Sequence, residues 1–266
     1  MAPEAAALGG GEAPDPERRF GGVARLYGAE GLARLQAAHV CVVGIGGVGS
    51  WVAEALARSA VGALTLVDLD MIHESNINRQ IHALDGDLGL AKVTAMARRI
   101  ARINPGCRVT EVEDFLSAEN LGEILGPGCG QVVDAIDNVR VKAALIAHCR
   151  RQRIPLIVAG AAGGQLDPTR IRVDDLARTV QDPLLAKVRA LLRREYGFTR
   201  EPGKKFGVEC VYSTEPLIYP KEAACAAEPA APAGLNCAGF GSSVCVTAGF
   251  GLAAAARVLG RIARGG

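Results

Sequence analysis

The chain has 266 residues, enough for one large α/β domain or for a domain with a smaller extension. Hydrophobic residues make up 49% and charged residues 22%, an ordinary globular balance. A net charge of +2 excludes a polycation, so contact with nucleic acid would need a local basic patch. No two of the eight cysteines form a Cys-x-x-Cys pair. Cys41, Cys107 and Cys149 fall in or beside expected buried elements, which favours a reducing cytoplasm over a disulfide framework.

The first part of the chain predicts alternating helices and strands after a disordered Ala/Gly/Pro tail at residues 1–17, which is no signal peptide. We expect helices at 22–37, 48–59, 89–103, 117–125 (with Ser117 as its cap) and 140–152. We expect strands at 39–43, 63–67, 108–112, 131–136 and 155–159. This alternation predicts an α/β fold, with a doubly wound, mostly parallel sheet over residues 18–160.

Residues 161–266 predict an irregular C-terminal extension. It would contain short strands at 171–173, 208–212 and 217–219, a basic helix at 183–196, a basic loop at 200–206, a mobile Ala/Pro-rich insert at 221–234 and a closing helix. Residues 235–256 carry no charge, but the strongly apolar part, Val244 to Ala256, is too short for a bilayer. The sequence therefore favours a buried helix over a membrane span.

A glycine loop, Gly44-Ile45-Gly46-Gly47-Val48-Gly49, joins the first expected strand to a helix. Glycines let the backbone approach phosphates, and a helix N-terminus offers free N–H groups to negative charge. In a dehydrogenase this loop would hold a dinucleotide, with Asp68 or Asp70 on the ribose hydroxyls. The loop alone therefore leaves an NAD(P)-dependent oxidoreductase open.

Later residues favour ATP over a dinucleotide. Arg79 and Lys92 add two positive charges near the same sheet edge, and displacement at an α-phosphate needs such neutralisation. Asp137 follows a strand at its carboxyl end, where α/β sheets bind ligands, and a carboxylate beside phosphates is typical of Mg²⁺. Asp137 could also only cap the following helix. The chain has no P-loop Gly-Lys-Ser/Thr, which argues against γ-phosphoryl transfer.

The joint pattern Gly-Ile-Gly-Gly-Val-Gly-Ser, Asp-Leu-Asp, Asn-x-Asn-Arg-Gln, Gly-Leu-Ala-Lys and Ile-Asp-Asn resembles the adenylation domain of the ThiF and MoeB group, in the ubiquitin-activating-type superfamily. The resemblance implies that a carboxylate is activated as an acyl-adenylate. It implies ATP and Mg²⁺ as cofactors, with a monovalent cation left open. The implied ATP-binding residues are Gly44, Gly46, Gly47, Asp70 (ribose), Asn78, Arg79, Gln80 and Lys92. Arg79, Lys92 and Asp137 would be catalytic, with Asp137 holding Mg²⁺.

Segments 19–28, 78–84, 163–168 and 208–215 more closely resemble the bacterial tRNA threonylcarbamoyladenosine dehydratases. This resemblance implies that the threonyl carboxylate beside the tRNA anticodon is adenylated, after which the ureido group closes a ring on the activated carbonyl. It also implies a cytoplasmic homodimer in which Arg19 or Arg25 reaches the partner's site, and partners in a sulfur-acceptor or cysteine desulfurase system. Gly22 stands where MoeB-like proteins have an arginine.

The segment 187–205 could contact tRNA phosphates or be only a solvated helix face. The predicted tRNA-binding residues are Arg189, Arg193, Arg194, Arg200, Lys204 and Lys205.

The missing zinc cysteines and the Arg-Phe-Gly-Gly start at residues 19–22 argue against a sulfur-carrier (ubiquitin-like) protein adenylyltransferase, the main alternative function. MoeB-like relatives carry paired Cys-x-x-Cys motifs for zinc, and the Cys210, Cys225, Cys237 and Cys245 spacing does not match them, so no zinc is expected. Cys210 could form a thioester, but it lies in an apolar run where cysteine usually packs as a small hydrophobe.

Overall fold

A computed structural model of the chain describes residues 14–126, 128–219 and 240–265. Its seven-stranded sheet has the order β3-β2-β1-β4-β5-β7-β6, parallel except for β6. The strands are β1 His39–Val43, β2 Ala63–Val67, β3 Arg108–Val112, β4 Gln131–Asp134, β5 Leu156–Ala159, β6 Ile171–Asp175 and β7 Glu209–Ser213. The order reverses between β1 and β4, and such a switch point is where doubly wound sheets bind ligands. The expected α/β fold is confirmed.

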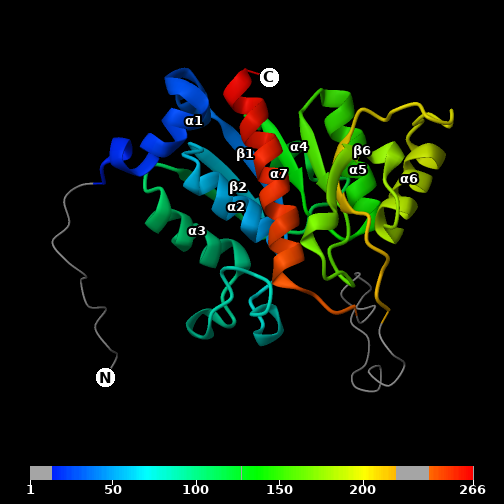
Figure 1. Ribbon diagram of the computed structural model, residues 1–266, viewed down its shortest axis with the longest axis horizontal. Helices are drawn as coiled ribbons and strands as arrows, with labels where there is room; N and C mark the ends of the chain where they lie inside the picture. Colours follow the sequence, from blue (N-terminus) through cyan, green and yellow to red (C-terminus); the bar gives the residue numbers. More distant parts are fainter. Residues whose placement is uncertain (1–13, 127, 220–239, 266) are drawn as a thin grey trace.

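Helices cover both faces of the sheet (Figure 1). The helices are α1 Pro16–Ala37, α2 Gly49–Arg58, α3 Lys92–Ile103, α4 Leu121–Leu125, α5 Val139–Gln152, α6 Pro183–Glu195 and α7 Val244–Arg264. One core contains side chains of α2, α3 and α7, and the other contains side chains of α4, α5 and α6. The central strands β1, β2, β4 and β5 are almost wholly buried, which explains their continuous apolar runs.

The C-terminal third of the chain extends the same sheet. β7 pairs with β5 in parallel and β6 pairs with β7 in antiparallel. The last helix, α7, packs against α1 and α2. It is long and apolar enough to pass a membrane-span test, but 56% of its apolar window is buried inside the protein, as in a core helix of a soluble fold.

Several boundaries differ from the expectations. Residues 217–219 form no strand; Ile218 N instead donates to Gly164 O. The helix expected at 117–125 begins only at Leu121, and Ser117 does not cap it because its hydroxyl accepts from Asn120 N one turn earlier. The helix expected at 89–103 begins at Lys92 because Gly89 has φ +81°. α1 already begins at Pro16, where Asp15 caps it.

The insert at 221–234, Cys225, Cys237 and residues 1–13 lie outside the described residues. Among the described residues Cys41 and Cys149 are buried, Cys107 is half-buried, and no disulfide forms.

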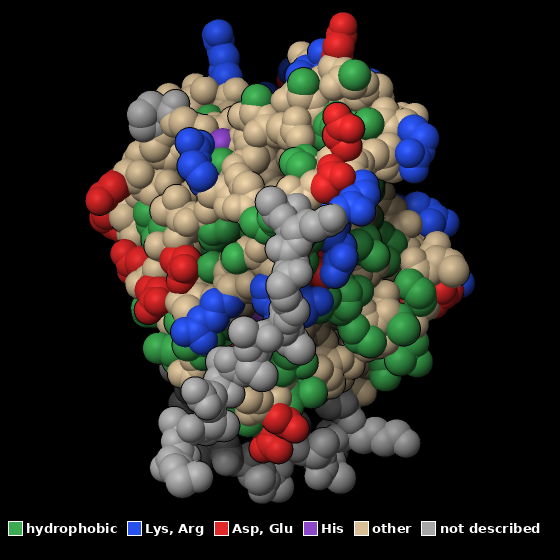
Figure 2. All heavy atoms as spheres, turned by 90° about the vertical axis from the view of Figure 1, so that its left-hand side faces the viewer, with side chains coloured by type: hydrophobic (Ala, Val, Ile, Leu, Met, Phe, Trp, Pro, Cys, Tyr) green, Lys and Arg blue, Asp and Glu red, His purple; other side chains and the backbone are tan. Residues whose placement is uncertain are grey.

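The two edges of the sheet carry different features. The carboxyl ends of β1, β2, β4 and β5 lie at the lower edge in Figure 1, with the glycine loop, residues 70–90 and the start of α7. The upper edge holds the ends of α5 and α7 and the loop before β7. A five-residue strand such as β6 spans roughly 17 Å from one edge of the sheet to the other. The left-hand side of the molecule mixes basic and acidic side chains (Figure 2).

Candidate active site

The glycine loop turns sharply between β1 and α2. Gly44 has φ +86°, which side-chain-bearing residues rarely adopt, and its N–H donates to Val67 O at 2.8 Å. A Cβ added to Gly49 would lie 1.7 Å from Gly44 O, so α2 can start this close to β1 only with glycine at position 49. Nothing lies nearer than 3.9 Å to a Cβ added at Gly46. The loop therefore leaves room at Gly46 for a ligand to approach its backbone.

Asp68, at the end of β2, fixes the glycine loop from the side. Its carboxylate accepts hydrogen bonds from Ile45 N at 2.6 Å and from Asp70 N at 2.9 Å. Burial raises the pKa of Asp68, although the charge of Lys92 and these backbone N–H groups act against that rise. With both oxygens used in this way, Asp68 is a structural residue of the loop.

Lys92 is the first residue of α3 and is 6% exposed. Its Nζ lies 2.6 Å from Asp70 Oδ2 and 4.0 Å from Asp68 Oδ1, and its backbone N–H donates to Asp70 O. A cation at a helix N-terminus opposes the helix dipole, so it needs anions nearby. Asp70 supplies one here, and its side chain is 56% exposed and free to turn toward a ligand.

Arg79 and Gln80 lie against the same loop. A Cβ on Gly47 would be 3.3 Å from Cγ and Cδ of Arg79, and one on Gly46 would be 3.9 Å from Gln80 Nε2. Trp51 Nε1 donates to Arg79 O at 3.0 Å, which holds this segment to α2. Burial lowers the pKa of the Arg79 guanidinium, and Gln80 Oε1 is buried with no hydrogen-bond partner among the described residues. A buried amide oxygen with no partner points to a group that a ligand would satisfy.

Asn78 accepts from Arg79 Nη1 at 2.9 Å and is exposed, so it orients that guanidinium in the ligand-free chain.

Asp137 lies in the turn from β4 to α5, beside the glycine loop. Ala135 N donates to Val43 O at 2.8 Å, and a Cβ on Gly44 would be 2.9 Å from Ala135 O. Asp137 is exposed. It is not the helix cap, because the Asn138 side chain accepts from the N–H groups of residues 140 and 141. The Asp137 carboxylate is therefore not used in capping α5 and could contact a ligand.

A buried ion pair supports this turn from behind. Lys142 Nζ lies 2.7 Å from Asp134 Oδ1, and both side chains are 0% exposed. Asp134 Oδ1 also accepts from Ile136 N at 3.0 Å, within the segment that leads to Asp137. Burial raises the pKa of Asp134, and Lys142 counteracts this only in part. Neither residue was expected at the site, since a lysine inside a helical run is typical of a solvent-exposed helix face.

Sequence comparisons place the chain in a known family. The sequence model of the ThiF family matches residues 21–248. A tRNA threonylcarbamoyladenosine dehydratase of Escherichia coli (strain K12) is 53% identical, with 91% of this chain and 92% of that protein covered. The chain belongs to the tRNA threonylcarbamoyladenosine dehydratases of the ThiF family.

Solved structures extend the likeness to this dehydratase family. The E. coli dehydratase TcdA in complex with ATP has a TM-score of 0.84 at 51% identity, covering 94% of this chain and 97% of that one. A crystal structure of the same protein in complex with AMP gives the same TM-score. In contrast, a molybdopterin-synthase adenylyltransferase of Salmonella typhimurium is 38% identical over 53% of this chain. The alternative function therefore has only the more distant support.

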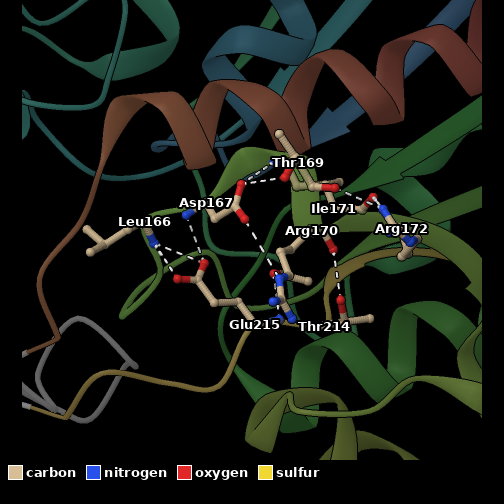
Figure 3. Close-up of polar contacts among 9 residues, drawn as sticks. Leu166, Asp167, Thr169, Arg170, Ile171, Arg172, Thr214 and Glu215 are labelled. Atoms are coloured by element: carbon tan, nitrogen blue, oxygen red, sulfur yellow. Dashed lines mark hydrogen bonds and ion pairs between the residues drawn. The ribbon is translucent and has the colours of Figure 1, made fainter.

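Two segments that carried the resemblance to the dehydratases contact each other (Figure 3). The Glu215 carboxylate, after β7, accepts from Leu166 N and Asp167 N, at 3.0 Å and 2.9 Å for Oε2. Asp167 in turn caps the short turn before β6 by accepting from Thr169 N. These bonds hold the loop after β5 to the end of β7, at the same sheet edge as the glycine loop.

The two N-terminal arginines lie away from the glycine loop of their own chain. Arg19 Nη1 donates to Ile103 O at 2.7 Å, at the opposite sheet edge, and Arg25 is exposed on α1. Their action in a partner's site stays a prediction.

The six residues predicted to bind tRNA divide into three pairs. Arg189 donates to Thr179 Oγ1, and the Arg193 guanidinium stacks over Phe206 at 5.2 Å from the ring centre, so both take part in packing. Arg194 pairs with Glu195 and Lys204 with Glu201. Arg200 donates to Arg193 O at 3.5 Å, and Lys205 is exposed. This segment ends at the upper edge in Figure 1, away from the glycine loop.

Cys210 is fully buried in β7, and burial raises its thiol pKa well above the ordinary value. A buried, protonated thiol is a poor nucleophile, which argues against a thioester at this position. Among the described residues no cluster of three metal-binding side chains occurs.

Proposed function

We propose that the chain catalyses the ATP-dependent cyclising dehydration of threonylcarbamoyladenosine in tRNA, next to the anticodon. The observation that carries this is the placement of Arg79, Gln80 and the Lys92–Asp70 pair around one glycine loop, in a chain 53% identical to a dehydratase. Two cations beside an open backbone loop suit a triphosphate better than the two phosphates of a dinucleotide.

The reaction follows from the electrostatics of that edge. A threonyl carboxylate oxygen attacks the ATP α-phosphorus, the bond to the β-phosphate oxygen breaks, and pyrophosphate leaves. Lys92, buried and hence weakly screened, would stabilise the charge that grows on the α-phosphate, while Arg79 takes the outer phosphates. Asp70 would release Lys92 and accept the ribose hydroxyls.

The second step needs no protein nucleophile. The ureido nitrogen attacks the acyl-adenylate carbonyl, loses its proton, and AMP departs with the former carboxylate oxygen. Because both groups belong to one side chain, the attack is intramolecular and is favoured by proximity. The product has lost one water, whose oxygen leaves in AMP.

The residues present fit Mg²⁺ bound through ATP. Magnesium uses one or two carboxylates and otherwise phosphates and water, and Asp137 is an exposed carboxylate that neither caps a helix nor pairs with a described cation. Asp137 would hold the ion, and the ion would supply charge neutralisation at the phosphates when bound.

The finer features of the proposal rest on the family. A cytoplasmic homodimer, with Arg19 or Arg25 completing the partner's site, is compatible with their position far from their own glycine loop. Partners of a cysteine desulfurase system and a monovalent cation remain part of the proposal. Residues 18–160 would bind ATP and residues 161–266 would contribute to binding tRNA.

Mass analysis of tRNA nucleosides tests the proposal. Incubation of the enzyme and ATP-Mg²⁺ with tRNA that carries threonylcarbamoyladenosine should remove one water from that nucleoside. Asp137→Asn and Lys92→Ala should abolish the loss, whereas Asp85→Asn, at an exposed turn, should leave it unchanged. Pyrophosphate exchange that needs a ubiquitin-like carrier protein instead of tRNA would favour the alternative adenylyltransferase. A rise in Tm with NAD but not with ATP would contradict both the dehydratase and the adenylyltransferase.

A further inference from the structure

A basic groove of about 760 Å³ opens at the upper edge of the sheet, between the C-terminal ends of α5 and α7 and the loop before β7. Six basic residues line it: Arg150, Arg153, Lys205, Arg257, Arg261 and Arg264. Its acidic lining residues are Asp174, Asp175 and Glu209. We name this feature the basic groove. The amino ends of β5 and β7 form its floor, so it is separate from the glycine loop at the carboxyl ends.

The acidic residues of the basic groove are already engaged. Asp175 accepts hydrogen bonds from the N–H groups of Phe206 and Gly207, at 2.8 and 2.7 Å, and is 9% exposed. Glu209 pairs with Arg257 and, at 2.7 Å, with Arg261. Asp174 pairs at 3.9 Å with Arg178, a residue that is not part of the groove lining. The remaining cations are therefore not neutralised by these carboxylates.

Three exposed cations of the groove have neither an ion pair nor a side-chain hydrogen bond in the part of the chain that the structure describes: Arg153, Lys205 and Arg264. Arg150 has no ion pair there either, but its guanidinium donates to Gly207 O. Arg153 has φ +56°, a left-handed conformation uncommon for a residue with a side chain, and it ends α5. Cations at helix ends also stabilise the free carbonyls there. That effect accounts for Arg264 in the last turn of α7. It does not account for Lys205, which lies in a loop and lines the same groove from a different segment.

Further cations lead from the active edge toward the basic groove. The edge strand β6 runs antiparallel to β7, so it starts at the glycine-loop edge and ends at the groove. Arg170 and Arg172 lie at its start (Figure 3), both exposed at the open side of the sheet, and Arg178 follows its end. Arg172 Nη1 bonds only to carbonyl oxygens of residues 169 and 171 among its described contacts.

We infer that the basic groove binds the phosphate backbone of the substrate tRNA, away from the modified base, so that the RNA runs along β6 from the active edge. The inference rests on the proposed function and places the RNA contact beyond α6. An RNA is favoured over a small anion because the unpaired cations come from three segments around an open groove. Further exposed cations, of which Arg172 has no ion pair among the described residues, continue along β6 over roughly 17 Å, so one extended polyanion can contact the groove and the strand together.

The test compares two triple variants. Arg153→Gly, Lys205→Gln and Arg264→Gln together remove the unpaired groove cations, and glycine suits the positive φ at position 153. The control, Arg98→Gln, Arg102→Gln and Arg108→Gln, removes three exposed cations from α3 and β3, on the side of the molecule where charges are mixed. Both variants should keep the rise in Tm that ATP-Mg²⁺ gives the wild type, which shows an intact fold and nucleotide site.

The salt dependence of tRNA binding, measured from 50 to 200 mM salt, should differ from that of the wild type only in the groove variant. Loss of three phosphate contacts makes the slope of log K against log[salt] less steep by about 2 to 3 and weakens tRNA binding at least about tenfold. Each single groove variant should give about a third of the change in slope.

The inference is wrong if the groove variant and the control have the wild-type slope while the wild type still converts the nucleoside. If the wild type converts no threonylcarbamoyladenosine, the proposed function fails instead, whatever the slopes are.

Discussion

The buried pair Lys142–Asp134 should be worth several kcal/mol when one partner alone is removed. Its Nζ–Oδ1 distance is 2.7 Å, both side chains are 0% exposed, and Asp134 Oδ2 has no other partner in the described structure. Lys142→Met would leave a fully buried carboxylate without its cation. Removing one member of such a pair typically costs about 3–5 kcal/mol, whereas replacing both can be nearly neutral.

Urea unfolding of the wild type, Lys142→Met, Asp134→Asn and the double variant measures this cost. We expect Lys142→Met to lower the free energy of unfolding by about 3 kcal/mol, which is roughly 6–12 °C in Tm for a domain of this size. Asp134→Asn keeps an acceptor for Ile136 N, and the double variant should cost at least about 2 kcal/mol less than the sum of the two single changes. Arg140→Met, exposed on the same helix, is the control and should change little.

Additive costs, or a loss below about 1 kcal/mol for Lys142→Met, would refute this reasoning and mean that the pair is hydrated in solution. A second measurement separates stability from site geometry. Because Asp134 also holds Ile136 N, Asp134→Leu should lower kcat more than it changes the KM for ATP, at a temperature where the variant is fully folded.

Three other outcomes follow from single residues. Burial and the charges of Lys92 and Arg99 lower the pKa of His82 to about 4, so the folded chain holds a neutral imidazole that the unfolded chain protonates near 6.5. The neutral His82 therefore contributes to the free energy of unfolding above pH 6.5, and about 2 kcal/mol of that contribution is lost when the pH falls to 5. Urea midpoints measured against pH should show this loss in the wild type and not in His82→Leu. Gly49→Ala should abolish the rise in Tm with ATP, because its Cβ would lie 1.7 Å from Gly44 O, whereas Gly86→Ala, with open space, should not. Cys210→Ala should retain full turnover in the nucleoside assay, and a dead but folded variant would restore the thioester hypothesis.

The local features of the fold were predictable because short-range chemistry fixes them. Strand β1, the glycine loop and the start of α2 follow from an apolar run, turn glycines and a helical period within about twenty residues. The expected strand at 217–219 failed because three apolar residues with no neighbour to pair with cannot be distinguished from a loop that packs on Gly164. Register with a distant partner decides such segments.

The long-range contacts of the site were not predictable. Lys92 and Asp70 were expected to touch phosphate and ribose, but their 2.6 Å ion pair depends on α3 starting beside the end of β2. Likewise, nothing in the run around Lys142 marks it as buried, because only the packing of α6 on α5 removes that helix face from water. Family motifs indicated the side chains that we propose to face the ligand, but they did not indicate the residues that hold those side chains in place.

The cations of the two sheet edges differ in hydration, and this separates their responses to salt. Lys92 is 6% exposed and held by Asp70, so its interaction with a phosphate takes place in a region from which water and ions are largely excluded. Lys205 and Arg153 are exposed, and the phosphates that they would bind release counterions. Raising the salt concentration from 50 to 200 mM should therefore raise the KM for tRNA much more than the KM for ATP. Equal changes in both constants would mean that tRNA is held mainly by the buried cations of the active edge.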